Sequence, residues 1–321
     1  VSKEERRSGR LDPASTAKVL LLLRVCGVAA MDHALSPWVL RELQFEHRLQ
    51  FQEHLGAISA YPGAANSATA GQRGHNRHEL ELQVPSSFVE PGDGRRPVLS
   101  EVVKNRLLHP IVAAAVADNE VIVDTFSTVT SLPGAQPQSW HRDTDTLFSG
   151  VPTPFTRPPH GIVVFVPLVD VVKVRAEEGR LPCAHALVVQ KNGPTEFVPG
   201  SHLDCPQKRT HQESGVWLCT RLVGAPLSMA APAGSAILFD IRITHRGGRN
   251  AAKFMRPMLY MSFVAPWFTD SDNNWSSKQT KALQLLPDDV WPVWRRVDQR
   301  QYVALLEARL AALGDDVGNL S

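Results

Sequence analysis

The residues of this chain best suited to chemistry are a histidine and an aspartate two positions apart, His141 and Asp143. On an extended strand such a pair points to one face, so the imidazole and the carboxylate can bind a single metal ion. His245, about a hundred residues later, is the natural third ligand. Two histidines and one carboxylate on one face of an octahedron leave three positions open, as in non-haem Fe(II) oxygenases. We therefore predict these three residues as metal ligands.

A second His-x-Asp pair, His202 and Asp204, must be weighed against the first. It directly follows Pro199-Gly200-Ser201, which is typical of a turn. A ligand pair at that place leaves only about three strands before His245, too few to wrap a β-barrel around the metal. His141 leaves room for those strands, so we favour the earlier pair.

Arg256 follows His245 by eleven residues, at the start of a run of strand-forming residues. A planar guanidinium group can hold a carboxylate through two parallel hydrogen bonds. Iron with open positions for a keto acid, together with an arginine for its far carboxylate, constitutes a 2-oxoglutarate site. We predict that Arg256 anchors this cosubstrate.

The elements that must position these residues change in type along the chain. Residues 12–118 are predicted to be helical and to pack on a sheet, with helices beginning at Asp12-Pro13 and Ser36-Pro37. A third helix is predicted over 99–117, broken or entered at Pro110. A short strand is predicted at 28–31. The polar residues 61–79 are predicted to be a solvated loop, with a substrate-facing position of Arg73, Arg77 and His78 as the alternative.

Short runs rich in valine, isoleucine and phenylalanine follow, separated by Pro and Gly, and they predict a double sheet over residues 119–268. The predicted strands are 121–130, 161–169, 197–198, 216–223, 227–230, 235–239 and 255–264. A C-terminal helical region, 269–321, closes the chain, with an amphipathic helix over 298–314. Without a linker or an internal repeat, the sequence predicts a single domain, 1–321, that is mainly β with flanking helices.

Composition excludes several other classes. A net charge of +2 without a basic cluster argues against nucleic acid as the partner. The longest apolar run, 19–31, is interrupted by Arg24 and is too short to span a membrane. The four cysteines form no C-x-x-C and predict reduced, structural thiols in an intracellular, cytoplasmic protein. A trimmed organelle-targeting segment stays open.

Three motifs together resemble the phytanoyl-CoA dioxygenase family: Gln-x-Trp-His-x-Asp at 138–143, Asn-Gly-Pro-Thr-Glu-Phe-Val-Pro-Gly-Ser-His at 192–202, and His-Arg-Gly-Gly-x-Asn at 245–250. The resemblance runs from about residue 12 to 274. It implies a double-stranded β-helix (a cupin-like jelly roll) and dependence on Fe(II) and 2-oxoglutarate. It also implies His141, Asp143 and His245 as iron ligands and Arg256 as the cosubstrate clamp. Gln138 and Thr195 match positions that face the site, with loop-shaping hydrogen bonds as the alternative.

One segment departs from the family pattern. Residues 172–190 stand between a predicted strand and Asn192-Gly193, where similar proteins connect almost directly. This insertion is either a surface loop or lid, or a stretch that arises from how the chain was translated from its gene. We expect it to pack poorly.

The resemblance implies a dioxygenase that uses O2 and releases succinate and CO2. Because Asp143 is intact, rather than replaced by a small residue that makes room for halide, hydroxylation of a small or medium organic molecule is favoured. Desaturation and ring formation stay open, and neither the substrate nor the oligomeric state follows from the sequence. The competing hypothesis is a non-catalytic, cupin-like protein that binds a metal or a small ligand.

Overall fold

The computed structural model describes residues 1–60, 76–90, 94–117, 120–144, 147, 158–171, 192–203, 225–268, 286–290 and 293–294. Its helices are α1 (Lys3–Ser8), α2 (Pro13–Cys26), α3 (Pro37–Ala60), α4 (Ser86–Val89), α5 (Val98–Val103) and α6 (His109–Val116). Its strands are β1 (Val28–Met31), β2 (Arg77–Glu81), β3 (Ile122–Ser131), β4 (Gly161–Pro167), β5 (Thr195–Phe197), β6 (Leu227–Met229), β7 (Ala236–Asp240), β8 (His245–Gly247) and β9 (Arg256–Val264).

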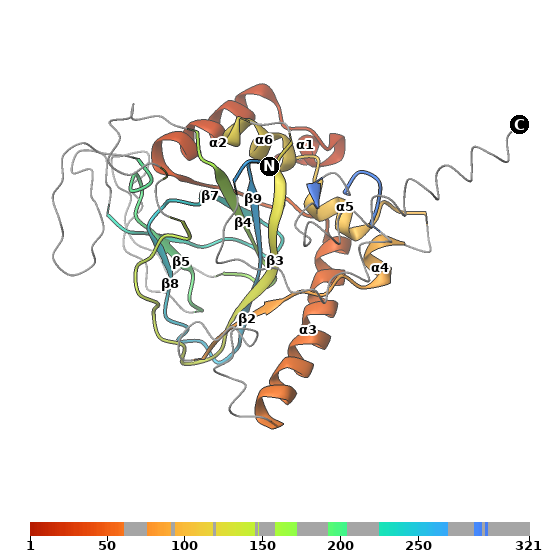
Figure 1. Cartoon of the computed structure of the whole chain (residues 1–321), viewed down its shortest axis with the longest axis vertical. Helices are drawn as coiled ribbons and strands as arrows, with labels where there is room; N and C mark the ends of the chain where they lie inside the picture. The colour runs from red at the N-terminus through yellow and green to blue at the C-terminus, as the bar shows by residue number, and fades with distance from the viewer. Residues whose placement is uncertain are drawn as a thin grey trace, which may run out of the picture.

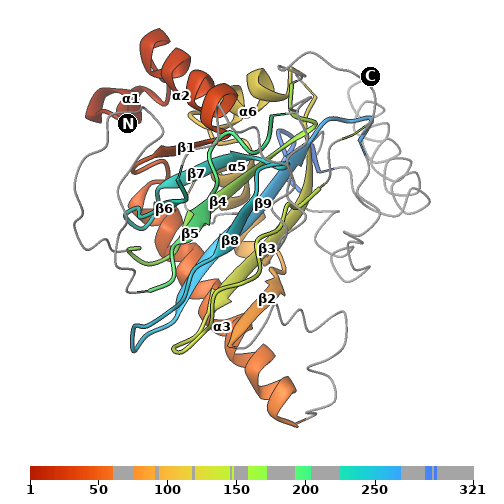
Figure 2. The ribbon, with the colours of Figure 1, turned by 90° about the vertical axis from the view of Figure 1, so that its left-hand side faces the viewer.

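The strands form two antiparallel sheets. The larger has the order β1-β7-β4-β9-β3-β2 and the smaller has the order β6-β5-β8. The smaller sheet lies against one face of the larger, whereas the helices cover the opposite face (Figures 1 and 2). The expected mainly-β architecture with flanking helices is therefore confirmed.

The alternation of side-chain directions along each central strand explains why the larger sheet is covered on both faces. On β4, Val164 and Val166 join the apolar core beneath the helices, whereas Val163 and Phe165 join the core between the sheets. Successive side chains of a strand point to opposite faces, so a strand buried on both sides reads as a continuous apolar run. Between the sheets, Phe239 of the larger sheet packs edge-on against Phe197 of the smaller, with ring centroids 5.0 Å apart. Each such buried ring contributes roughly 1.5–3 kcal/mol.

The predicted strands that fall among the described residues are confirmed to within two residues of their bounds. The cap of α2 is also as predicted: the Asp12 side chain accepts a hydrogen bond from the Ser15 amide, and Gly27 ends the helix with φ of 78°. The predicted strand 216–223, the insertion 172–190 and the helix 298–314 lie outside the described residues. The division of the chain into regions stays a prediction.

One expectation for the N-terminal half is wrong. Residues 77–79 were expected to belong to a solvated loop, but they form part of β2, which pairs with the whole outer half of β3. Arg77 and His78 are consequently only 1% and 6% exposed. Polar composition misleads here because the neighbouring side chains that cover this edge strand come from distant parts of the chain. Residues 61–75, which include Arg73, lie outside the described residues.

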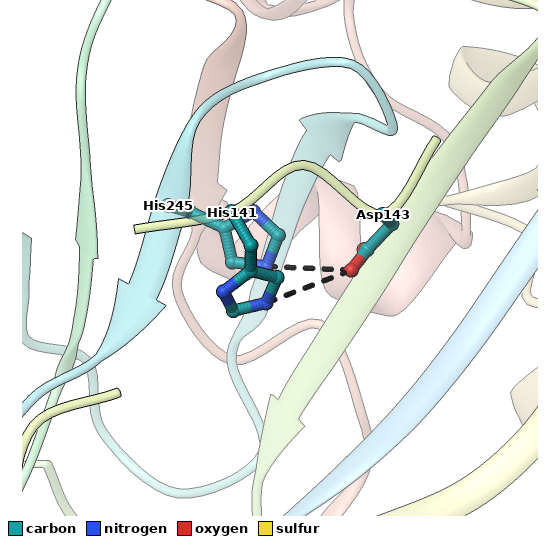
Figure 3. A group of neighbouring side chains, drawn as sticks. All are labelled: His141, Asp143 and His245. Atoms are coloured by element: carbon teal, nitrogen blue, oxygen red, sulfur yellow. Dashed lines mark ion pairs between the residues drawn. The ribbon is translucent and has the colours of Figure 1, made fainter. Parts of the chain in front are cut away.

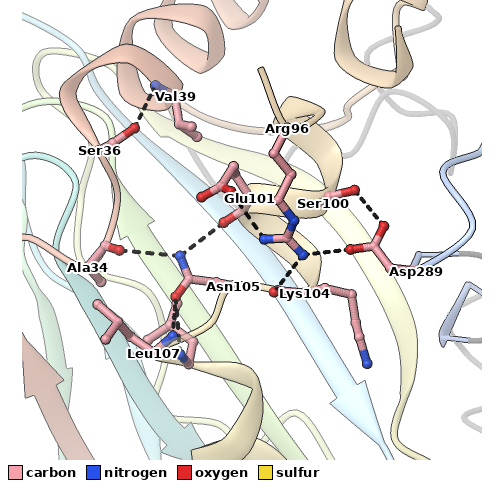
Figure 4. A network of polar contacts seen from close by, with 11 residues as sticks. Ala34, Ser36, Val39, Arg96, Ser100, Glu101, Lys104, Asn105, Leu107 and Asp289 are labelled. Atoms are coloured by element: carbon pink, nitrogen blue, oxygen red, sulfur yellow. Dashed lines mark hydrogen bonds and ion pairs between the residues drawn. The ribbon is translucent and has the colours of Figure 1, made fainter. Parts of the chain in front are cut away.

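The helix expected over 99–117, with a break or an entry at Pro110, is two helices, α5 and α6, and Pro110 lies in the first turn of α6. Asn105 causes the break: its side-chain oxygen accepts hydrogen bonds from the amides of Leu107 and Leu108, at 2.9 and 3.1 Å. Its side-chain amide donates to the carbonyl oxygens of Ala34 and Glu101 (Figure 4). Asparagine thereby offers the backbone an alternative to continued helix.

The same close-up shows how a distant segment is attached to α5. Arg96 forms ion pairs with Glu101 and Asp289, and the Ser100 hydroxyl donates to Asp289 at 2.7 Å (Figure 4). Residues 286–290 are thus held against the helical layer.

Cys26 corrects a further expectation. It is disulfide-bonded, so the prediction of reduced thiols is wrong for this residue. The other cysteines lie outside the described residues. Among the described helices, none combines the length and apolar character needed to cross a membrane.

Candidate metal centre

The two histidines of the predicted triad lie opposite each other in an isolated antiparallel bridge. The His141 amide donates to the His245 carbonyl at 3.0 Å, and the His245 amide donates to the His141 carbonyl at 2.9 Å. The segment that leads to His141 continues this pairing, because the Gln138 amide donates to the Gly247 carbonyl at 3.0 Å. Residues far apart in the sequence are thereby brought face to face by backbone hydrogen bonds.

The carboxylate of Asp143 completes the cluster (Figure 3). Its Oδ1 atom is 3.9 Å from Nε2 of His141 and 3.6 Å from Nε2 of His245. One ligand atom of each of the three residues lies within 4.8 Å of the others, and no other set of described residues gathers potential metal ligands in this way. The structure therefore brings together all three residues predicted as ligands.

The hydrogen bonds around the triad test whether it suits a metal. Nδ1 of His141 lies 2.9 Å from the Ser139 carbonyl, and Nδ1 of His245 lies 3.1 Å from the Ile243 carbonyl. A carbonyl only accepts, so in the neutral ring the proton is on Nδ1 and the lone pair of Nε2 faces Asp143. The second oxygen of Asp143 is buried without a hydrogen-bond partner. The lone pairs of the two Nε2 atoms and of the Asp143 carboxylate repel one another unless a cation lies between them. These residues therefore fit a bound metal ion.

Neighbouring side chains fix the ligands in place. His245 is buried, and its ring packs against Phe197 and Phe239 with centroids 5.9 and 5.0 Å away. Arg142 lies between His141 and Asp143 in the sequence, and its side chain donates to the Ser201 carbonyl at 2.6 Å. These contacts limit the freedom of both ends of the site.

A buried ion pair shapes the turn that leads from β7 to His245. Arg242 donates from its backbone amide and from Nε to one oxygen of Asp240, each at 2.9 Å, and its Nη2 lies 2.7 Å from the other. Burial alone would raise the pKa of Asp240, but the hydrogen bonds and charge of Arg242 outweigh it and keep this pKa below its usual value. The carboxylate stays ionised and the turn keeps its shape.

A small cavity adjoins the triad and includes the remaining predicted site residues. Its wall consists of Val129, Gln138, His141, Asp143, Phe165, Thr195, His245, Gly247, Arg256 and Tyr260. Two larger hollows, of about 690 and 360 Å³, lie elsewhere and contain no member of the triad. Phe165 and Tyr260, which the sequence analysis did not single out, are the aromatic residues of this wall.

Arg256, the first residue of β9, is 2% exposed. Its Nη2 donates to the Gly193 carbonyl at 2.6 Å, whereas its Nε has no hydrogen-bond partner. Burial, followed by the positive charge of Arg77, lowers the pKa of Arg256 to about 9. A buried guanidinium with an unused donor at a cavity wall is a receptor for an anion.

Gln138 and Thr195 occupy opposite sides of Gly247. The side-chain oxygen of Gln138 accepts from the Gly247 amide at 2.8 Å, so the loop-shaping bond that was the alternative for this residue is present. Thr195 is buried and pairs with Gly247 in the register of β5 and β8. Both residues also line the cavity.

The rival pair is not part of this centre. His202 is buried against Gly27, and its Nε2 lies 3.2 Å from the Arg24 carbonyl. Asp204 lies outside the described residues. Arg77, for which the sequence analysis preferred a solvated loop over a position facing a substrate, lies directly behind Gly247.

Solved structures of known proteins share the fold of this chain. A carbocyclase from nogalamycin biosynthesis, SnoK, described as non-haem and α-ketoglutarate-dependent, aligns at 15% identity and a TM-score of 0.50, over 79% of this chain and 84% of that one. The epimerase SnoN, solved with Fe3+, α-ketoglutarate and nogalamycin RO, aligns at 17% identity and a TM-score of 0.50, over 79% and 84%. AviO1 from Streptomyces viridochromogenes Tue57 aligns at 19% identity and a TM-score of 0.50, over 81% and 99%.

These structures show that the fold is the double-stranded β-helix of 2-oxoglutarate oxygenases. The family model for phytanoyl-CoA dioxygenase (PhyH) matches residues 43–258, a span that includes the whole triad and Arg256. The chain therefore belongs to the phytanoyl-CoA dioxygenase family of iron- and 2-oxoglutarate-dependent oxygenases.

Proposed function

We propose that this oxygenase hydroxylates a small or medium organic molecule, with consumption of O2 and 2-oxoglutarate and release of succinate and CO2. The observation that carries the proposal is the convergence of His141, Asp143 and His245 beside a cavity that also contains Arg256. With the carboxylate ligand intact, iron has no vacant ligand position for halide, which favours transfer of oxygen to the substrate.

Each residue has a distinct task in this proposal. His141, Asp143 and His245 would hold the iron, and with only three protein ligands it would stay accessible to the cosubstrate and O2. When bound, the iron supplies the activation of O2 that couples decarboxylation of 2-oxoglutarate to oxidation of the substrate. Arg256 pairs with the far carboxylate of 2-oxoglutarate and thereby orients its keto-acid end toward the triad.

The cavity wall supports the same reaction. Val129, Phe165 and Tyr260 provide an apolar surface beside the ligands and exclude bulk water from the reacting atoms. Gln138 holds the backbone of Gly247 in place, and Thr195 contributes a hydroxyl group at the wall. Nothing in the described wall identifies the substrate itself.

A second outcome is favoured by a specific observation. Two solved structures with this fold are described as a carbocyclase and an epimerase, and ring formation or epimerisation starts from the same ligand set. A non-catalytic, cupin-like binding role is disfavoured, because family membership and the complete triad agree on an oxygenase.

The test begins with the metal. Protein reconstituted with Fe(II) without oxygen, then mixed with 2-oxoglutarate, should develop a weak visible charge-transfer band and contain one iron per chain. His141→Ala should lose both signals, whereas His33→Ala, at an exposed histidine, should keep them. Well-folded wild-type protein without the band would refute the iron and 2-oxoglutarate assignment.

The reaction type needs a separate measurement. A screen of candidate substrates for stimulated succinate release identifies a turnover partner, and the product is then formed under 18O2. Hydroxylation places one labelled oxygen atom in the product. A cyclised or epimerised product that contains no label would replace our proposal with the second outcome.

A further inference from the structure

Arg77 is a second buried cation beside the proposed cosubstrate cavity. It begins β2, which pairs with β3 at the edge of the larger sheet. Its Nη2 donates to the carbonyl oxygens of Gly248 and Gln136, at 2.9 and 3.3 Å. Its Nε and Nη1 atoms are buried and have no hydrogen-bond partner among the described residues. Two unused donors on a fully buried arginine are costly unless a ligand satisfies them.

The guanidinium of Arg77 lies on the inner side of β8. His245 and Gly247 are two positions apart on this strand, so their side-chain directions share one face. A Cβ atom built on Gly247 would lie 2.5 Å from Nη1 and 2.7 Å from Cζ of Arg77. Arg77 therefore occupies the space that a side chain at 247 would fill, on the face that presents the histidine ligand. Gly247 itself lines the cavity.

Arg77 and Arg256 hold two adjoining turns. Arg77 donates to the Gly248 carbonyl and Arg256 to the Gly193 carbonyl. The turns are joined directly, because the Gly248 amide donates to the Pro194 carbonyl at 2.9 Å. The two guanidinium groups are also electrostatically coupled, and burial lowers the pKa of Arg77 to about 10. No described carboxylate forms an ion pair with either arginine.

Like charges buried together without an acid need an anion to offset their repulsion and their lost hydration. We propose that Arg77 is a second binding cation for the cosubstrate and acts with Arg256 on the far carboxylate of 2-oxoglutarate. This inference rests on the proposed function, because it takes 2-oxoglutarate as the ligand. It makes the cavity selective for 2-oxo acids that carry a second carboxylate, and it lets a dicarboxylate bind before any metal does.

The experiment measures binding by calorimetry rather than turnover. Wild-type, Arg77→Gln, Arg77→Lys and Arg249→Gln proteins are loaded with Fe(II) without oxygen and titrated with 2-oxoglutarate or 2-oxovalerate. The second ligand has the same carbon chain, but a methyl group replaces the far carboxylate. Arg249 is an exposed residue beside the same turn and controls for a general change in charge.

Arg77→Gln should weaken 2-oxoglutarate binding about tenfold or more, equivalent to about 1.4 kcal/mol, and leave 2-oxovalerate binding unchanged. Arg77→Lys should keep most of the affinity, and Arg249→Gln should keep all of it. Equal losses for both ligands in Arg77→Gln would show that Arg77 only shapes the site and would overturn the inference. Unchanged 2-oxoglutarate affinity would overturn it as well.

The melting temperature of the metal-free protein provides a second measurement, which remains informative if one variant folds poorly. Succinate at millimolar concentration should raise the melting temperature of the wild type and of Arg77→Lys, but not that of Arg77→Gln. If Arg77→Gln does not fold, a lysine variant that loses both affinity and thermal response would overturn the inference. Wild-type protein that binds no 2-oxoglutarate would instead refute the proposed function, and this inference with it.

Discussion

His141 and His245 exchange backbone hydrogen bonds in both directions, and their rings lie 4.5 Å apart at the centroids. The geometry of two ligands is therefore fixed by main-chain pairing rather than by side-chain packing alone. Asp143, two residues past the bridge, is placed by the chain as it turns away from β8. A change at one ligand side chain should thus disturb the metal far more than the fold.

Asp143→Ala should lower iron affinity and 2-oxoglutarate-dependent succinate formation by at least about 100-fold. It removes one of three ligands and also a buried, unpaired carboxylate oxygen, so the metal-free variant should be as stable as the wild type or more so. Iron content, succinate yield and melting temperature check these outcomes. Glu53→Gln, at an exposed carboxylate, should behave as the wild type; a similar loss there would point to a non-specific effect.

Arg256→Gln should weaken 2-oxoglutarate binding by roughly 30-fold or more, because it removes a buried charge partner worth about 2–5 kcal/mol. The visible band with 2-oxovalerate should be unchanged, since that ligand does not use the arginine. Titrations with both acids measure the effect. An equal loss for both would mean that Arg256 supports the strand β9 rather than the cosubstrate.

His47 should make the protein sensitive to acid. Burial lowers its pKa to about 4 from the usual 6.5. Between these two values the unfolded chain binds a proton that the folded protein does not, so the free energy of unfolding falls as the pH is lowered from 6.5 to about 4. The loss from this residue alone is up to roughly 3 kcal/mol.

His47→Gln, which can keep a hydrogen bond to Thr130, should therefore lose less stability than the wild type on acidification. Urea unfolding at pH 7 and pH 4.5 measures the difference. His33→Gln, at an exposed histidine, should lose as much as the wild type. Parallel losses in the wild type and His47→Gln would contradict the assignment.

Gly247→Ala should destabilise the protein by about 1–3 kcal/mol and weaken 2-oxoglutarate binding, because the added methyl group meets the Arg77 guanidinium. Gly56→Ala, in helix α3 with nothing within 4 Å of the added atom, should instead be neutral or stabilise by up to about 1 kcal/mol. Thermal unfolding of both variants tests the contrast. A harmless alanine at 247 would show that Arg77 can move away from the strand.

The sequence predicted the site residues whose spacing along the chain is short and characteristic. Asp143 lies two residues from His141, and Arg256 lies eleven residues from His245, so each pair is readable within one element or one turn. The strands β4 and β9 were predictable because burial on both faces requires unbroken apolar runs. The carbonyl oxygens that accept hydrogen bonds from Arg77, in contrast, belong to Gln136 and Gly248, far along the chain, so local composition could not predict the burial of this residue.

Asn105 shows why the exact position of a helix break is harder to predict than its presence. Its neighbours favour a helix, and the break depends on a single side chain that caps the amides of Leu107 and Leu108. Cys26 shows a second reason for failure, since a disulfide joins distant parts of the fold and the spacing of the four cysteines did not predict it.

Strand β1 has a practical consequence for work with fragments. It forms one border of the larger sheet and pairs with β7 through four residues, Val28 to Met31. A truncated version that begins at residue 43, where the family match begins, would discard β1 and leave unpaired the amide and carbonyl groups of β7 that face it. Unpaired edge strands can pair with strands of other chains, so such a shortened protein should aggregate even though it retains every proposed iron ligand.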